Sequence, residues 1–369
     1  YDNEVQGAGF RLGKTEEFVW DTLPTDVDFG LDGNLYWSDW VSGWNQTGKG
    51  RLYRMVPEGR DAAEEAAIAD TRATLLRLAA EGGSGNGIEG SRDASLSAAS
   101  GYMDEELVEL FSHRDRRVRQ EAQLALAHRA LNEPDQVEGQ RHMVPVLKRL
   151  QEPAISERGR TARLHAIWTV WHVARRSTAL GESLPKHLTG LLFDEDSEVV
   201  AQACRVFGDL GWQPAGRRIP QLLIHDSPRV RLFAAQALGG IGLAETSTAG
   251  LFELLDTSAA TDPWLRHAAI HALERLGNPG DLHAQLAHPA EHVRRAVAVV
   301  LRRWKDEAIA ALLSDPSGSV RAEAARAIFD AGISGGMDEL AAFLGSAPEE
   351  TDHLTWRRAV QACREVATE

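Results

Sequence analysis

Four aspartates near the beginning of the chain have a residue type and clustering that could hold a cation. Asp26, Asp28, Asp32 and Asp39 lie in one stretch rich in Gly and aromatic residues, and Ca²⁺ prefers carboxylate ligands. Their spacing lacks the alternating ligands and terminal Glu of a calcium loop, whereas Asp32-Gly33 fits a turn. Three interpretations stay open: turn and strand-end roles, a metal site, or an active-site rim formed by Asp26 and Asp39.

Two further stretches carry pairs of histidines. His165 and His172 share a helical face with Trp168, and His267 and His271 are one helical turn apart, a spacing that can chelate zinc. No Glu stands between His267 and His271, as the metalloprotease motif requires. Further ligands are not evident for either pair. We therefore expect packing or surface roles, with no metal and no catalytic residue assigned.

The amino-acid composition argues against several classes of site and function. Cys204 and Cys363 are too few for a disulfide framework or a four-thiolate zinc site, and we expect them to be buried and inert. With 40 Lys and Arg against 54 Asp and Glu, the net charge of −14 argues against nucleic-acid binding. No apolar stretch approaches the roughly 18 residues that cross a membrane, so no membrane insertion is expected. The Cys-x-x-Cys-His motif of haem c attachment is absent.

Residues 1–58 are predicted to form a small antiparallel β segment. Asp32-Gly33 between alternating apolar runs is a hairpin signal, and four or five short strands would make about one β-propeller blade. Trp37 and Tyr53 are expected in its core, and Trp40 and Trp44 against the subsequent helices or on a carbohydrate platform. One blade cannot bury both faces alone. Neighbouring blades are therefore missing, or the blade packs on the helices that come after it in the chain.

The composition changes after this segment. Residues 59–103 are predicted to hold a helix over Asp61–Glu81 and a Gly/Ser-rich linker over Gly82–Ser100. From residue 104 to residue 369 an apolar helix, a short turn with Asp or Pro, and a second helix recur. Each second helix opens with an apolar residue. An Arg usually follows it, and a small residue usually stands four positions after the apolar residue. The copies begin at Val118-Arg119, Ala162-Arg163, Val199-Val200, Val230-Arg231, Leu265-Arg266, Val293-Arg294, Val320-Arg321 and Trp356-Arg357.

This repeat predicts a mainly α fold, an α-α superhelix of about eight helical hairpins. Spacings between 27 and 44 residues suit helical pairs that bury their apolar faces only by stacking. The aspartates of the turns, as in Asp226-Ser227-Pro228 and Asp315-Pro316-Ser317, are expected to cap the second helices. The recurrent arginines are expected to contact turn carboxylates or carbonyls of adjacent repeats, with a ligand-binding ladder as the alternative. They are Arg119, Arg163, Arg231, Arg266, Arg294, Arg321 and Arg357.

The repeat resembles HEAT repeats of the phycobilisome-lyase-like kind. The stretch from Leu23 to Met55, "LPTDVDFGLDGNLYWSDWVSGWNQTGKGRLYRM", is similar to a terminal propeller blade of the glucose/sorbosone dehydrogenase type. Together with "FSHRDRRVRQEAQLAL" (Phe111 to Leu126) and "RLHAIW" (Arg163 to Trp168) after it, it resembles the large membrane-bound, haem-binding dehydrogenases of planctomycetes and verrucomicrobia.

This resemblance implies a bacterial, extracytoplasmic redox protein with a propeller, a HEAT region and a cytochrome module. Most of the propeller and the haem motif are absent here, so haem c and a quinone would belong to the parent protein. The implied role is a non-catalytic scaffold between dehydrogenase and electron-accepting domains, its partners being those neighbouring domains or another protein. Two alternatives stay open: part of a sugar or alcohol dehydrogenase with its active site upstream, or a stand-alone HEAT-repeat adaptor.

Overall fold

The computed structural model describes residues 3–41, 48–80, 101–133, 135–152, 156–242, 247–257 and 260–367. The chain forms two compact units, unit 1 with Tyr1–Glu4 and Leu12–Leu188, and unit 2 with Val5–Arg11 and Thr189–Glu369. The expected linker over Gly82–Ser100 and the position of Trp44 lie outside the described residues.

The N-terminal strands form two antiparallel sheets instead of one blade. One sheet is β1-β2 and the other is β3-β4-β5. The strands are β1 (Asn3–Gln6), β2 (Gly9–Leu12), β3 (Pro24–Phe29), β4 (Leu35–Asp39) and β5 (Arg51–Met55). The tip of the β1-β2 hairpin packs with unit 2, because the backbone amide of Ala8 finds its acceptor there, on the Asp262 carboxylate.

The three-stranded sheet of unit 1 leaves an apolar face uncovered. Its register places Val27 opposite Trp37 and Trp37 opposite Tyr53, so these side chains share one face. The Trp37 and Tyr53 rings stack with centroids 5.2 Å apart, but both side chains are only half-buried, so they do not form the buried core that the sequence predicts. Val27 and Phe29 on the same face are nevertheless 59% and 58% exposed. This sheet therefore does not bury its own apolar face.

The first helix of unit 1, α1, lies where the sequence predicts a helix. Its residues Leu75 and Leu78 are buried, and α1 packs on α3. The elements are α1 (Ala62–Ala80), α2 (Asp104–Glu109), η1 (Leu110–Ser112), α3 (Arg116–Asn132), α4 (Gln136–Leu150), α5 (Glu157–Ala174) and α6 (Thr178–Ser183), and η2 (Pro185–Phe193) continues into unit 2.

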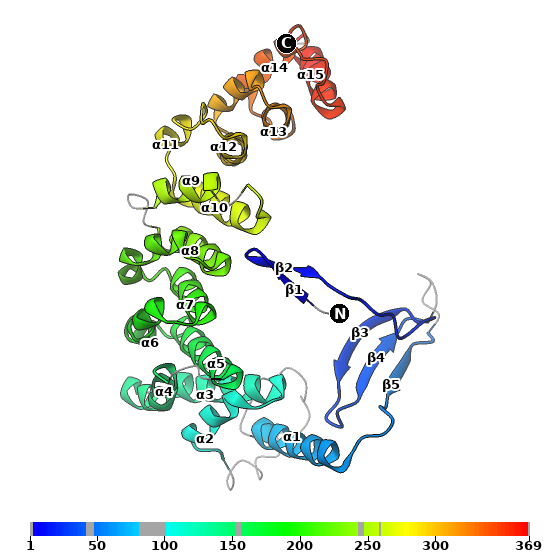
Figure 1. Ribbon diagram of the computed structural model, residues 1–369, viewed down its shortest axis with the longest axis vertical. Helices are drawn as coiled ribbons and strands as arrows, with labels where there is room; N and C mark the ends of the chain where they lie inside the picture. The colour runs from blue at the N-terminus through cyan, green and yellow to red at the C-terminus, as the bar shows by residue number, and fades with distance from the viewer. Residues whose placement is uncertain are drawn as a thin grey trace. The chain divides into compact units, whose positions relative to one another are not determined.

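Unit 2 also consists of helical hairpins, whose helices α7 to α15 follow one another in Figure 1. Many of its first helices are short or of the 3₁₀ type. The elements are α7 (Ser197–Leu210), η3 (Gln213–Arg217), η4 (Ile219–Ile224), α8 (Pro228–Ile241), α9 (Thr248–Thr257), α10 (Pro263–Leu276), α11 (Pro279–His283), α12 (Glu291–Trp304), η5 (Glu307–Ser314), α13 (Gly318–Asp330), η6 (Ser334–Gly336), α14 (Met337–Phe343) and α15 (His353–Val366).

We call the helix after each turn the second helix. The described residues contain eight of them, α3, α5, α7, α8, α10, α12, α13 and α15, which confirms the predicted number of hairpins. In the first seven repeats the apolar anchor and the residue four positions later, such as Val230 and Ala234, are buried. In the last hairpin the buried pair is Thr355 and Ala359, so the repeat register lies one residue before Trp356. The chain is a HEAT-like solenoid, mainly helical, with small N-terminal sheets.

The turn aspartates cap the second helices at some repeats but not at others. Asp115, Asp196 and Asp262 are N-caps whose carboxylates accept bonds from backbone amides of the first turn. The N-cap of α8 is instead Ser227, which makes no side-chain cap bond. Asp315 accepts from the Ser317 amide, one residue before α13 begins. The expected role therefore differs at Asp226 and Asp315.

Helices α7 and α8 approach each other more closely than side chains of ordinary size permit. A Cβ atom added to Gly208 would lie 2.5 Å from the Ala237 Cα, and one added to Gly240 would lie 2.2 Å from the Gly208 carbonyl oxygen. Glycine is required at these positions because the two backbones touch. Because the residues at this contact are small, they line a hollow that is bordered by larger side chains.

Candidate functional site

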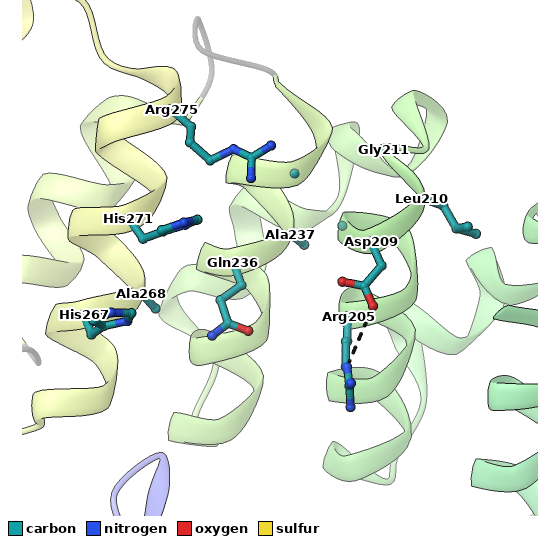
Figure 2. A pocket seen from close by; sticks show the side chains of 12 residues that line it. Arg205, Asp209, Leu210, Gly211, Gln236, Ala237, His267, Ala268, His271 and Arg275 are labelled. Carbon is teal, nitrogen blue, oxygen red and sulfur yellow. Dashed lines mark ion pairs between the residues drawn. The ribbon is translucent and has the colours of Figure 1, made fainter. Parts of the chain in front are cut away.

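The second helices α7, α8 and α10 surround a pocket of about 670 Å³, which we call the second-helix pocket. Its polar side chains come from three consecutive repeats and lie around one hollow (Figure 2). Its floor is formed by small residues of the α7–α8 contact. The lining residues are Arg205, Gly208, Asp209, Leu210, Gly211, Gln236, Ala237, Gly240, His267, Ala268, His271 and Arg275.

The charged groups of the pocket are not used to hold the fold together. Within the described part of the chain, the Arg275 guanidinium makes no hydrogen bond or ion pair, and its side chain is exposed. Arg205 approaches the Asp209 carboxylate at 3.9 Å, with both side chains about half exposed. An exposed pair of this kind contributes little stability. These side chains are therefore available to a ligand.

The histidines at i and i+4 on α10 belong to this pocket. The His267 and His271 rings are nearly parallel, with centroids 6.4 Å apart. Among the described residues no group of three or more His, Cys, Asp or Glu side chains could hold a metal ion. The pair contributes ring nitrogens that can donate or accept hydrogen bonds, with His267 exposed and His271 half-buried.

In the other histidine pair, His165 is buried between α3 and α5, whereas His172 is half-buried. His165 is 6% exposed, its Nδ1 lies 2.8 Å from Gln123 Oε1, and Arg119 Nε donates to its Nε2 at 3.3 Å. Its ring meets Trp168 edge to face at 5.0 Å. Burial, and to a lesser degree the charge of Arg119, lowers the pKa of His165 to about 4. A neutral ring therefore joins α3 to α5.

Beside the second-helix pocket, unit 2 holds a segment of its own chain. Ala8 is 2% exposed, and its amide donates to Asp262 Oδ2 at 2.7 Å. The other oxygen of Asp262 caps α10 by accepting from the Trp264 and Leu265 amides. Gly7 has φ +59°, and a Cβ on Gly9 would meet the Trp264 indole at 2.1 Å. The hairpin tip therefore fits the start of α10 only with glycine on both sides of Ala8.

The recurrent arginines mostly hold the turns of their own hairpins. Arg119 donates to the carbonyls of His113 and Arg114, and Arg294 to those of His288 and Pro289. Arg321, Arg163 and Arg266 also reach carbonyls that precede their helices. The guanidinium thus supplies donors to turn carbonyls that the helices leave unpaired.

Some of these arginines also contact a turn carboxylate of the next repeat, as Arg321 does at 3.9 Å from Glu350. Arg294 forms a two-point ion pair with Asp315 of the next hairpin, at 2.6 and 2.8 Å. Arg231 has a buried Nε without a partner among the described residues and lines a smaller pocket beside the hairpin tip. Arg357 is exposed, and the neighbouring Arg358 pairs with Asp330 instead.

The aspartates of the β segment do not come together as one site. Asp32 accepts from the Asn34 amide, the Asn34 side chain and the Tyr36 hydroxyl, which orders the turn. Asp39 is buried and accepts from the amides of Leu23 and Val41 at 2.9 Å, and these bonds hold its pKa below the ordinary value. The exposed Asp26 lies opposite Ser38, and so on the other face of the sheet from Asp39. Their rim role remains a prediction.

The two thiols differ in burial, so the expectation that both are buried is correct only for Cys204. Cys204 is fully buried, and burial raises the pKa of its thiol to about 12, whereas Cys363 is half-buried and donates to the Ala341 carbonyl. Among the described residues, the helices are all too short or too polar to span a bilayer.

The comparisons with known proteins concern the solenoid. Residues 217–284, which include η4, α8, α9 and α10, match the family described as HEAT repeats. No curated protein matches the chain in sequence. The matched segment therefore contains two of the three helices that line the second-helix pocket.

Several solved structures are similar to the chain. An engineered protein shares 19% identity with a TM-score of 0.41, covering 84% of this chain and 89% of its own. The complex of CpcE and CpcF of phycocyanin lyase from Nostoc sp. PCC7120 shares 16% identity with a TM-score of 0.35, covering 71% and 99%. Importin beta shares 14% identity with a TM-score of 0.46, covering 83% and 47%.

Sequence reasoning missed the pocket although it named His267 and His271. Arg205, Gln236 and His271 each stand six residues after the apolar anchor of their repeat, at Val199, Val230 and Leu265. This shared offset places them at equivalent positions on successive second helices. Aligning the repeats by offset, instead of searching for motifs, would have found them.

Proposed function

We propose that the chain is a non-catalytic interaction scaffold that binds a protein partner through the second helices of unit 2. The observation that carries the proposal is the second-helix pocket, where polar and charged side chains of three repeats are exposed and not needed for packing. Solenoids present extended surfaces of this kind to their ligands. The pocket volume also falls within the range of known binding sites.

Photo-crosslinking in the cells that express the protein tests this role. A photoreactive amino acid replaces Gln236 in the pocket or, as control, the exposed Gln221 of η4. We expect a cross-linked partner with the Gln236 replacement and none with the Gln221 replacement. Equal capture at both positions, or none at either, would contradict a partner site at the pocket.

A finer role is that this scaffold joins a β-propeller dehydrogenase domain to an electron-accepting module. The observation in its favour is the uncovered apolar face of the β3-β4-β5 sheet, because exposed Val27 and Phe29 side chains favour a neighbouring β structure. Haem c, and a quinone if one is used, would then be held by the other domains of the parent protein. An upstream sugar or alcohol dehydrogenase site is the related alternative.

The intact mass of the native protein, measured with its absorbance spectrum, tests the redox assignment. A mass far above 40.4 kDa together with a c-type haem band is expected. A mass near that value without haem would leave the scaffold as an independent adaptor. In that case the sheet face would need another explanation.

A further inference from the structure

We propose that the second-helix pocket binds an acidic peptide segment, whose carboxylates lie between Arg205 and Arg275. The proposal rests on the scaffold function and names the chemistry of the partner. Three features of unit 2 support it: the charges around the pocket, the composition of its floor and the segment held beside it.

The pocket has a positive excess in a protein that is negative overall. The pocket lining contains two arginines and one aspartate, Asp209, whereas the net charge of the whole chain is −14. A guanidinium offers a planar pair of donors that matches a carboxylate. Gln236 and the rings of His267 and His271 add further polar groups. An anionic ligand would give Arg275 the partner that it lacks among the described residues.

Two features of the pocket disfavour an anion. Their repulsion is weaker than the attraction that the two arginines exert on it. Asp209 repels a carboxylate, but it already lies 3.9 Å from Arg205. The pocket is also near the C-terminal ends of α7, α8 and α10, where each helix dipole corresponds to about half a negative charge. The free charge of Arg275 stands at the end of α10 and offsets this partial charge. The balance therefore favours a carboxylate placed close to the two guanidinium groups.

The size and floor of the pocket favour a peptide over a single small anion. A volume of about 670 Å³ exceeds what one carboxylate fills. The small residues Gly208, Ala237, Gly240 and Ala268 line the pocket, which leaves room for the main chain of a peptide. At the start of α10, the Gly7-Ala8-Gly9 tip is already held by a backbone amide and by close packing against Asp262 and Trp264. Trp264 and His271 are seven residues apart on α10, or about 10 Å. A peptide in the pocket would thus lie next to the hairpin tip.

The test measures binding of labelled peptides to the full chain by fluorescence anisotropy at low ionic strength. The probe is a peptide of alternating Gly and Glu, and the neutral reference replaces every Glu by Gln. The double variant Arg205→Gln/Arg275→Gln removes both guanidinium groups. The control Arg217→Gln removes the same kind of charge from an exposed position of unit 2 outside the pocket. Circular dichroism melts establish that all variants fold.

We expect binding of the acidic probe only, weakened about tenfold or more in the double variant and less than about twofold in the control. Added salt should also weaken it. Equal affinity of both peptides, undiminished affinity of the double variant, or no binding of the acidic probe would overturn the proposal. If a partner still cross-links at Gln236 in that event, the scaffold function stands. If the probe binds through the arginines but no partner cross-links, the scaffold function fails and the anion site stands.

Discussion

The backbone amide of Ala8 donates a hydrogen bond to the Asp262 carboxylate at 2.7 Å, across 254 residues of chain. One carboxylate therefore serves two purposes, because its other oxygen caps α10. The contact fixes the hairpin tip beside the second-helix pocket. It also places residues 5–11 in unit 2, while the chain on either side belongs to unit 1.

Asp262→Asn should release the hairpin tip while leaving α10 folded. Asn has one acceptor oxygen, and it can either cap the helix or accept from Ala8, but not both. We expect amide hydrogen exchange in residues 5–10 to accelerate, with a melting temperature close to that of the unmodified protein. Asp226→Asn, at an exposed turn without a cap bond, is the matched control. Unchanged protection of the hairpin would show that packing against Trp264 holds it without the carboxylate.

The Arg294–Asp315 pair should be the most costly ion pair to break. Its side chains are only 9% and 3% exposed, so Arg294→Leu leaves a buried unpaired carboxylate and should cost about 3–5 kcal/mol. Adding Asp315→Asn removes that charge, keeps an acceptor for the Ser317 amide and should recover part of the loss. Thermal unfolding compares the three proteins.

Arg358→Leu serves as the reference, because its partner Asp330 is 43% exposed. That change should cost about 1 kcal/mol or less. Equal losses at the two sites would mean that the Arg294 pair is better hydrated than its burial indicates.

Val230→Asp tests the predicted repeat register directly. Val230 is fully buried, so a carboxylate there has no water and no partner and should cost about 3 kcal/mol or more. Ile224→Asp makes a comparable change at a side chain that is 73% exposed, and it should stay within about 0.5 kcal/mol. Circular dichroism melts report both. A small loss at Val230 would place the buried side of α8 elsewhere.

The repeat could be predicted because its period is local. An apolar anchor and a small residue four positions on, as at Val230 and Ala234, lie on the same side of a helix, so sequence alone locates the buried face. In the last hairpin the anchor is Thr355, a polar residue type, and the apolar Trp356 drew the predicted register one residue too far. Burial of Thr355 is set by the neighbouring helices and not by its own hydrophobicity.

The second-helix pocket and the hairpin contact could not be predicted in the same way. The equivalent pocket positions hold Arg205, Gln236 and His271, which share no side-chain type. Gly7-Ala8-Gly9 has no apolar pattern to indicate burial, and its acceptor Asp262 is far away in the chain. Glycine permits a close approach but does not specify to which surface. Aligning the repeats would locate the pocket positions, whereas only the tertiary structure reveals the hairpin contact.

His165 should make the protein sensitive to mild acid. Its pKa is lowered from 6.5 to about 4 by burial first and by the Arg119 charge second. The unfolded chain therefore binds a proton near pH 6.5 that the folded chain does not accept until near pH 4. The neutral ring contributes stability that is fully present above pH 6.5 and is lost progressively as the pH falls towards 4, on the order of 3 kcal/mol in all.

Unfolding free energies measured between pH 7 and pH 4 test this dependence. His165→Gln keeps a polar side chain at the site but has no group that titrates there, so its stability should fall less steeply over this interval. His128→Gln, at an exposed histidine of α3, should keep the slope of the unmodified protein. A His165→Gln slope as steep as that of the unmodified protein would assign the acid sensitivity to other groups. Protonation of the His165 ring would then cost the folded protein little stability, although the ring contacts Arg119.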